Sequence, residues 1–161
     1  MIAYNGSDVR RINHSLKVTA FATLIAELEG CSPDIVERTA VAAILHDIGI
    51  HAAEANHGST AGKYQELEGP AIASQLLDEI DAPDALKERV CFIVGHHHTL
   101  GAIDGLDFQI LVEADCLVNA YEDQLSPEGI QSMRRKAFRT KSGSLLFDTM
   151  YTEGALEGPS E

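Results

Sequence analysis

The chain has 161 residues and carries 12 Lys and Arg against 25 Asp and Glu, which gives a formal net charge of −13. Such a negative field repels a nucleic-acid backbone and an anionic bilayer, so we expect neither as a partner. A small phosphorylated molecule stays compatible, because a bound dication with a few local Lys or Arg can reverse the potential inside one cleft. The length predicts one domain over 1–161, with a core over about 8–138.

Composition favours a helical fold. Apolar residues make up 45% of the chain and aromatic residues only 6%, so the core should be built from Ala, Leu, Ile and Val. The three cysteines are widely spaced without a Cys-x-x-Cys pair, which predicts reduced, buried thiols. No basic-then-apolar leader and no apolar run of about 20 residues is found, so a cytoplasmic location is the expectation.

Apolar periodicity predicts an all-α fold throughout the chain. Helices are expected over about 8–29, 33–47, 70–80, 83–95, 107–122 and 127–138, with a short apolar segment over 145–151. The periodicity fades over 50–69, where glycines and small polar residues predict a long loop before Pro70 restarts a helix. Residues 153–161 are expected to be frayed.

The dipeptide His46-Asp47 falls at the predicted C-terminal end of the second helix. Adjacent helical residues point about 100° apart, which lets both side chains reach one ion there. His14 and Asp115 are natural further ligands, since each lies on an otherwise apolar helix where an unpaired ionisable group is costly. Taken singly, each residue could instead be a hydrogen-bonded core residue. Together they predict a site for one divalent ion.

The order of these residues resembles the HD-domain metal-dependent phosphohydrolases: His14, then His46-Asp47 within HDIGI, then Asp115 within LVEADCLVN. The resemblance runs from about Asp8 to Glu122. It implies a bundle of five or more helices around a His-His-Asp-Asp site that hydrolyses a phosphate ester of a small metabolite, a nucleotide being one option. The implied ion activates a water and polarises the phosphoryl oxygen. Mn, Co, Ni, Fe, Mg and Zn all stay compatible with this donor set.

A second metal is left open by the triplet His96-His97-His98, which follows a predicted helix end. In two-metal HD proteins histidines here help to hold the second ion. The resemblance therefore implies that His96 and His97 bind a second metal, or bind phosphate and protonate the leaving oxygen. The alternative is that one caps the helix and another is solvated. Two-metal members carry another His where this chain has 65–69. Glu66 or Glu68 could substitute there as an oxygen donor, Glu68 being the one kept as a candidate site residue, or either could be an ordinary first-turn acid.

Substrate contacts are predicted from position alone. Lys17 shares a helical face with His14 and ranks above Arg10, Lys63 lies in the glycine-containing loop, and His51 closely follows Asp47. The loop is not a P-loop, because Tyr64 follows Lys63 where Ser or Thr is required. The residues after Asp47 also lack the acidic pair of the guanosine-tetraphosphate-hydrolysing branch.

Two other functions compete with hydrolysis. One branch of the same fold resembles diiron oxygenases, which need a second metal. A third reading is a non-catalytic ligand-binding domain stabilised by its metal. A homodimer is left open.

Overall fold

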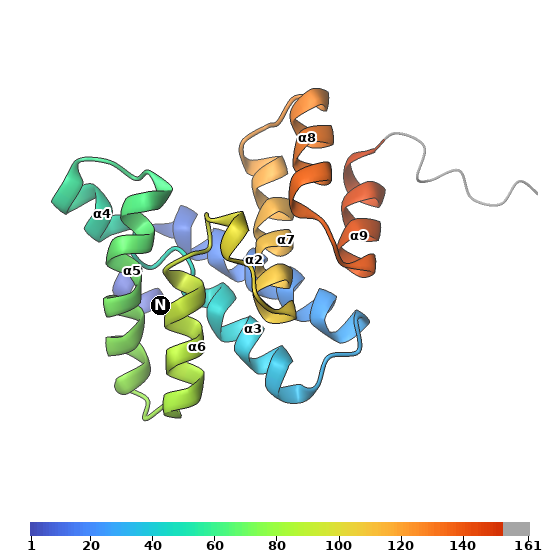
Figure 1. The fold of residues 1–161 in the computed structure, drawn as a ribbon. Coiled ribbons are helices and arrows are strands. Elements are labelled where there is room, and N and C mark those ends of the chain that lie inside the picture. Colours follow the sequence, from blue (N-terminus) through green and yellow to red (C-terminus); the bar gives the residue numbers. More distant parts are fainter. Residues whose placement is uncertain (153–161) are drawn as a thin grey trace, which may run out of the picture.

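A computed structural model describes residues 1–152, and the predicted fraying of 153–161 lies outside them. All regular elements in the described part of the chain are helical, which confirms the all-α prediction (Figure 1). The helices are α1 (Ile2–Asn5), α2 (Val9–Leu28), α3 (Pro33–Leu45), α4 (Ile50–His57), α5 (Gly62–Asp78), α6 (Asp84–Val94), the 3₁₀ turn η1 (Leu100–Ala102), α7 (Leu106–Glu122), α8 (Pro127–Ala137) and α9 (Lys141–Tyr151).

The predicted loop over 50–69 is wrong, because this stretch forms α4 and the first half of α5, and Pro70 lies inside α5 rather than at its start. Only Ala53 of α4 is buried, so this helix has too little apolar surface to show a periodic pattern. Of the glycines taken as loop signals, Gly58 ends α4 in the left-handed conformation, whereas Gly62 lies in α5 against the His98 ring. A Cβ on Gly69 would lie 2.6 Å from the Val94 side chain.

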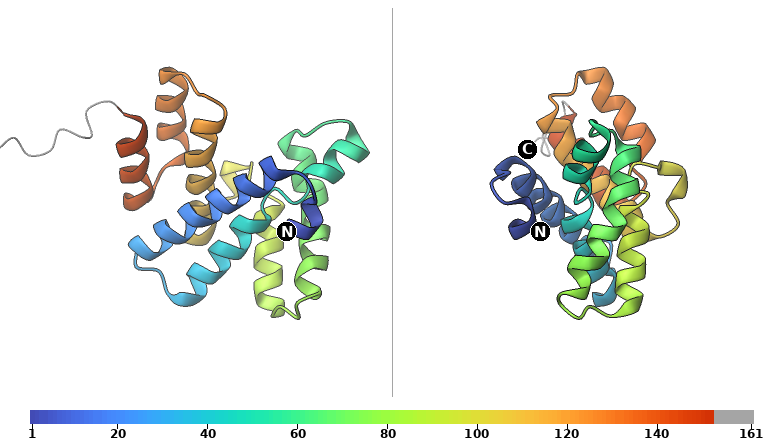
Figure 2. Two further views of the ribbon diagram at one scale, coloured as in Figure 1. Left: turned by 180° about the vertical axis from the view of Figure 1, so that it is seen from behind. Right: turned by 90° about the vertical axis from the view of Figure 1, so that its left-hand side faces the viewer.

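Two groups of helices are joined by α2 and α3 (Figures 1 and 2). The first group is the antiparallel pair α5 and α6, with α4 at one end. The second is α7 with α8 and α9 packed beside it. Because α2 contacts α3 and α7, residues near one end of these three helices can meet.

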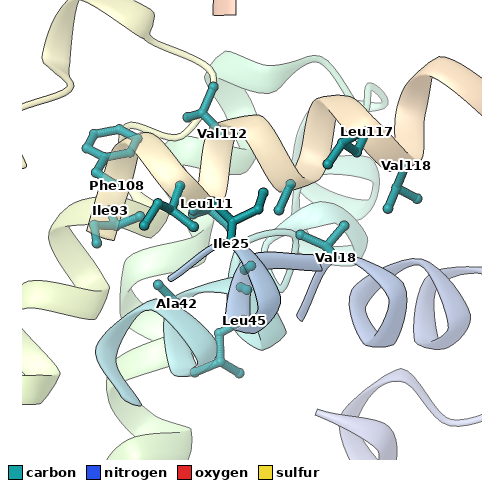
Figure 3. Close-up of a cluster of buried hydrophobic side chains, with 14 of the residues drawn as sticks. Val18, Ile25, Ala42, Leu45, Ile93, Phe108, Leu111, Val112, Leu117 and Val118 are labelled. Carbon is teal, nitrogen blue, oxygen red and sulfur yellow. The ribbon is translucent and has the colours of Figure 1, made fainter. Parts of the chain in front are cut away.

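The core lies where α2, α3 and α7 cross, with α6 closing one side (Figure 3). Its fully buried side chains include Ile25, Ile93, Phe108 and Leu111. At about 25 cal/mol per Å² of apolar surface, burial of such side chains is the main force that fixes these helices. The three cysteines are free thiols and half-buried, less enclosed than predicted.

None of the helices within 1–152 is long and apolar enough to cross a bilayer.

Candidate metal centre

Four side chains from three helices converge in the described structure. His14 comes from α2, His46 caps the end of α3 with Asp47 following, and Asp115 comes from α7. His14 Nε2 lies 3.3 Å from His46 Nε2 and 3.2 Å from Asp115 Oδ1. Asp47 Oδ2 lies 3.6 Å from His14 Nε2 and 3.5 Å from His46 Nε2. The structure therefore brings all four predicted ligands together.

The hydrogen bonds around the two imidazoles show which atoms face the centre. His46 Nδ1 donates to the Ala43 carbonyl at 2.7 Å, and His14 Nδ1 donates to Glu122 Oε2 at 3.0 Å. Each neutral imidazole carries one N–H, so both Nε2 atoms present lone pairs. In this neutral form, two imidazole lone pairs and two carboxylate oxygens face one another. Such a donor set fits a divalent cation.

Electrostatics favour positive charge at this point. Burial alone lowers the pKa of His46, but Asp47 and Asp115 outweigh it and raise the pKa to about 9. The pKa of His14 is also raised, since its bond to Asp115 overcomes the effect of burial. The pKa values of both carboxyl groups are lowered, because the imidazoles outweigh the opposing effect of burial. Without a metal ion the carboxylates therefore stabilise the protonated imidazoles. A bound metal ion would displace these protons.

A second group lies on the other side of Asp47. Asp47 Oδ1 is 3.5 Å from His97 Nε2, and Asp47, His97 and His98 offer ligand atoms close enough to share an ion. His97 Nδ1 donates to the Val94 carbonyl at 2.8 Å, while its buried Nε2 has no hydrogen-bond partner among the described residues. Burial lowers the pKa of His98 to about 4, which keeps its imidazole neutral. This orphaned nitrogen fits a second cation, with Asp47 placed between the two groups.

His96 and Glu68 are not brought to either group. His96 Nδ1 donates to the Phe92 carbonyl at 2.7 Å, and its ring stacks on Phe92 at 4.5 Å between centroids. Glu68 accepts a hydrogen bond of 2.8 Å from His57 Nε2. His98 takes the place expected for His96, and Gly62 makes room for it, since a Cβ there would lie 2.5 Å from the His98 ring.

A cleft of about 240 Å³ opens on the metal centre. It is lined by Arg10, Arg11, His14, Asp47, Ile50, Thr60, Asn119 and Glu122. The side chain of Asn119 donates to Asp115 Oδ1 at 2.9 Å, so it fixes a ligand as well as lining the cleft. Sequence reasoning missed Arg11, Thr60, Asn119 and Glu122. Helical spacing carried part of the signal, because Arg11 and Asn119 lie three and four residues from His14 and Asp115.

The three predicted substrate contacts lie outside the lining of this cleft. Lys17 pairs with Glu122 and borders a separate apolar cavity. Lys63 Nζ lies 4.6 Å from the ring centre of Tyr64. His51 Nε2 lies 3.6 Å from Asp8 Oδ2.

An all-α bundle that brings two His and two Asp together in this way has the architecture of a candidate metal-binding domain. The HD domain family model matches residues 11–132, and the chain belongs to this family. This confirms the resemblance drawn from the sequence. A comparison with curated proteins and one with solved structures each give no significant match.

Proposed function

We propose that the protein is a metal-dependent phosphohydrolase that cleaves a phosphate monoester of a small metabolite. The observation that carries the proposal is the convergence of ligand atoms from two His and two Asp, two of which, His14 and Asp47, line a cleft that also holds two guanidinium groups. HD-domain proteins are generally metal-dependent hydrolases, which agrees with this arrangement.

The residues present fit a divalent ion, which His14, His46, Asp47 and Asp115 would hold. When bound, the ion supplies a water of lowered pKa and polarises a phosphoryl oxygen. With four protein donors, such an ion would still have room to bind a water and the substrate. A second ion would draw on His97, His98 and the free oxygen of Asp47.

The chain itself binds and orients the substrate. Arg10 and Arg11 line the cleft with N–H donors suited to the non-bridging phosphate oxygens. Arg11 also pairs with Asp8 at 3.4 Å and lies 3.9 Å from Glu54. Glu122 holds His14 in the tautomer whose Nε2 lone pair faces the centre. Asn119 holds the Asp115 carboxylate in one orientation. These contacts keep the reacting groups in place before substrate arrives.

The test is phosphate release from an aryl phosphate and a panel of natural monophosphates, by protein loaded in turn with Mn, Co, Ni, Fe, Mg and Zn. Asp47→Ala should abolish release, since Asp47 faces both groups of ligands. Asp78→Ala is the matched control, because Asp78 forms only an exposed pair with Lys87. A protein that binds stoichiometric metal and cleaves no ester would contradict the proposal and favour the non-catalytic ligand-binding domain.

A diiron oxygenase is the second candidate, and the Asp47, His97 and His98 group is the observation that favours it. Two irons per chain with oxygen consumption would support it. One ion per chain, with phosphate release in the absence of oxygen, would favour hydrolysis.

A further inference from the structure

Apart from the guanidinium groups of Arg10 and Arg11, which the proposed function assigns to the phosphate, the lining of the cleft offers little planar surface for a nucleobase. Among the described residues that line it, Ile50 is the one aliphatic side chain and the metal ligand His14 is the one ring. Bases are usually held by stacking on an aromatic or guanidinium plane, in addition to hydrogen bonds. The volume of about 240 Å³ also lies below the usual range for drug-sized ligands, which begins at about 300 Å³.

Aromatic surface is present nearby but lies behind an ion pair. Glu122 lines the cleft, whereas its partner Lys17 lines an apolar cavity of about 360 Å³ together with Phe21, Tyr121 and Tyr151. The Lys17–Glu122 pair therefore stands between the two spaces. A base attached to a phosphate in the cleft would have to displace this pair to reach the rings.

Tyr64, the aromatic residue that follows the lining residue Thr60 most closely in sequence, is already engaged. Tyr64 follows Thr60 by four residues, and its ring stacks on His57 with 4.3 Å between centroids. Lys63 lies over the same ring. Stacking a base on Tyr64 would mean giving up these contacts.

The polar groups of the cleft match hydroxyl groups instead. Because the amide nitrogen of Asn119 donates to Asp115, its carbonyl oxygen remains as an acceptor. The Thr60 hydroxyl and the Glu122 carboxylate line the same cleft. Among the described residues that line it, Ile50 is the one apolar side chain. Alcohol O–H groups can donate to these acceptors while the two arginines take the phosphate.

We propose that the substrate is a phosphomonoester of a small hydroxylated compound without an aromatic base, such as a polyol or a simple sugar. This inference rests on the proposed phosphohydrolase function. Asn119 is the residue that distinguishes such an ester from an alkyl phosphate, through the acceptor oxygen that it presents in the cleft.

Two matched pairs of compounds test the inference on the full chain loaded with Mn²⁺. Ribose 5-phosphate against adenosine 5′-monophosphate isolates the base, and glycerol 3-phosphate against propyl phosphate isolates the hydroxyls. The kcat/KM of the first member should exceed that of the second by about tenfold or more in each pair, as expected for a hydrogen-bonding site that is partly open to water. Dissociation constants from titration calorimetry on metal-free protein should follow the same order.

Asn119→Leu should bring the ratio for glycerol 3-phosphate against propyl phosphate close to one. Because this variant also frees Asp115, both rates will fall, and the ratio between substrates is the informative quantity. Thr60→Val, on an exposed residue, gives a second variant should Asn119→Leu fail to fold. It should lower the same ratio.

The outcomes separate the two proposals. If no ester is cleaved but ribose 5-phosphate binds more tightly than the nucleotide, the hydrolase proposal fails and the ligand class stands. If the nucleotide is cleaved faster than ribose 5-phosphate, or propyl phosphate as fast as glycerol 3-phosphate, the hydrolase proposal stands and the ligand class is overturned.

Discussion

His14 Nδ1 donates to Glu122 Oε2 across 3.0 Å, which joins the second turn of α2 to the last turn of α7. Glu122 also pairs with Lys17, so one carboxylate orients the imidazole of a metal ligand and an amine one turn further along α2. Carboxylates that accept from a ligating imidazole strengthen it as a donor. The pair therefore ties metal affinity to the packing of α2 against α7.

Glu122→Gln should weaken metal binding by about tenfold, because the neutral amide stabilises the donating imidazole less than a carboxylate does. The dissociation constant can be measured by competition with a chromophoric chelator. Glu68→Gln is the matched control, since Glu68 bonds His57 in a pair that is part of neither ligand group. Equal affinity of wild type and Glu122→Gln would show that the bond does not support the metal.

His97→Ala should lower the number of metal ions bound per chain, or the affinity for the second ion, because the orphaned Nε2 of His97 faces Asp47. His96→Ala should leave both quantities unchanged, since the His96 ring is turned to Phe92. Metal content after dialysis, by atomic emission, separates the two variants. A larger loss in His96→Ala than in His97→Ala would refute this assignment.

Gly143→Ala should strongly destabilise the fold. Glu113 is fully buried and accepts from the Arg139 and Thr140 backbone amides and from the Gln109 side chain, and a Cβ on Gly143 would collide with its carboxylate. We expect a loss on the order of 3 kcal/mol in the free energy of unfolding, measured with denaturant.

Gly129→Ala is the matched control for that substitution. Gly129 occupies the same position after its cap, bonding Ser126 as Gly143 bonds Thr140, but a Cβ there meets only ordinary contacts from 3.5 Å. This variant should be neutral or slightly more stable, because Ala favours a helix by about 1 kcal/mol over Gly. Similar losses in both variants would contradict a specific role for Glu113.

Acid should remove the contribution of the Asp107–Arg89 pair. Burial raises the pKa of Asp107, but its bonds from Arg89 outweigh that effect and the pKa is lowered overall. A carboxyl with a lowered folded pKa stabilises the fold above its unfolded pKa of about 3.9 and loses that contribution as pH falls through the folded value. Asp107→Asn should therefore be less stable than wild type at neutral pH, with a gap that narrows below about pH 4. Denaturant titrations at several pH values measure the gap, and a constant gap would count against the assignment.

His14 and Asp115 were predictable because each places an ionisable group on an apolar helix, where it needs a partner, and His46-Asp47 because the dipeptide stands at a helix end in the order that the HD resemblance implies. Their partners were not. Glu122 and Asn119 act through contacts between helices or along one helix face, which depend on how α2 and α7 cross. Lys17 shares a turn with His14, yet this places it against α7 rather than in the cleft.

Glycine was the least predictable residue type. In sequence, Gly58 and Gly62 indicated a break, whereas in the structure Gly58 ends α4 and Gly62 permits close approach to His98. A missing side chain leaves no periodic signal, so the α4 and α5 region was predicted as loop. The role of His98 was not predicted for the same reason, because the position of its ring depends on the space left by the absent side chain of Gly62.

The glycine of HDIGI, Gly49, comes within reach of α5 at backbone level: a Cβ on it would lie 2.6 Å from both the Gln65 carbonyl oxygen and the Gly69 nitrogen. The main chain just after Asp47 thus rests directly on the helix that follows Thr60. The distance between the metal ligands and the outer wall of the cleft is consequently set by two main chains in contact, which cannot adjust as side chains do. A single methyl group at position 49 would clash with the backbone of α5, so α5 and the main chain that follows Asp47 could not keep this contact.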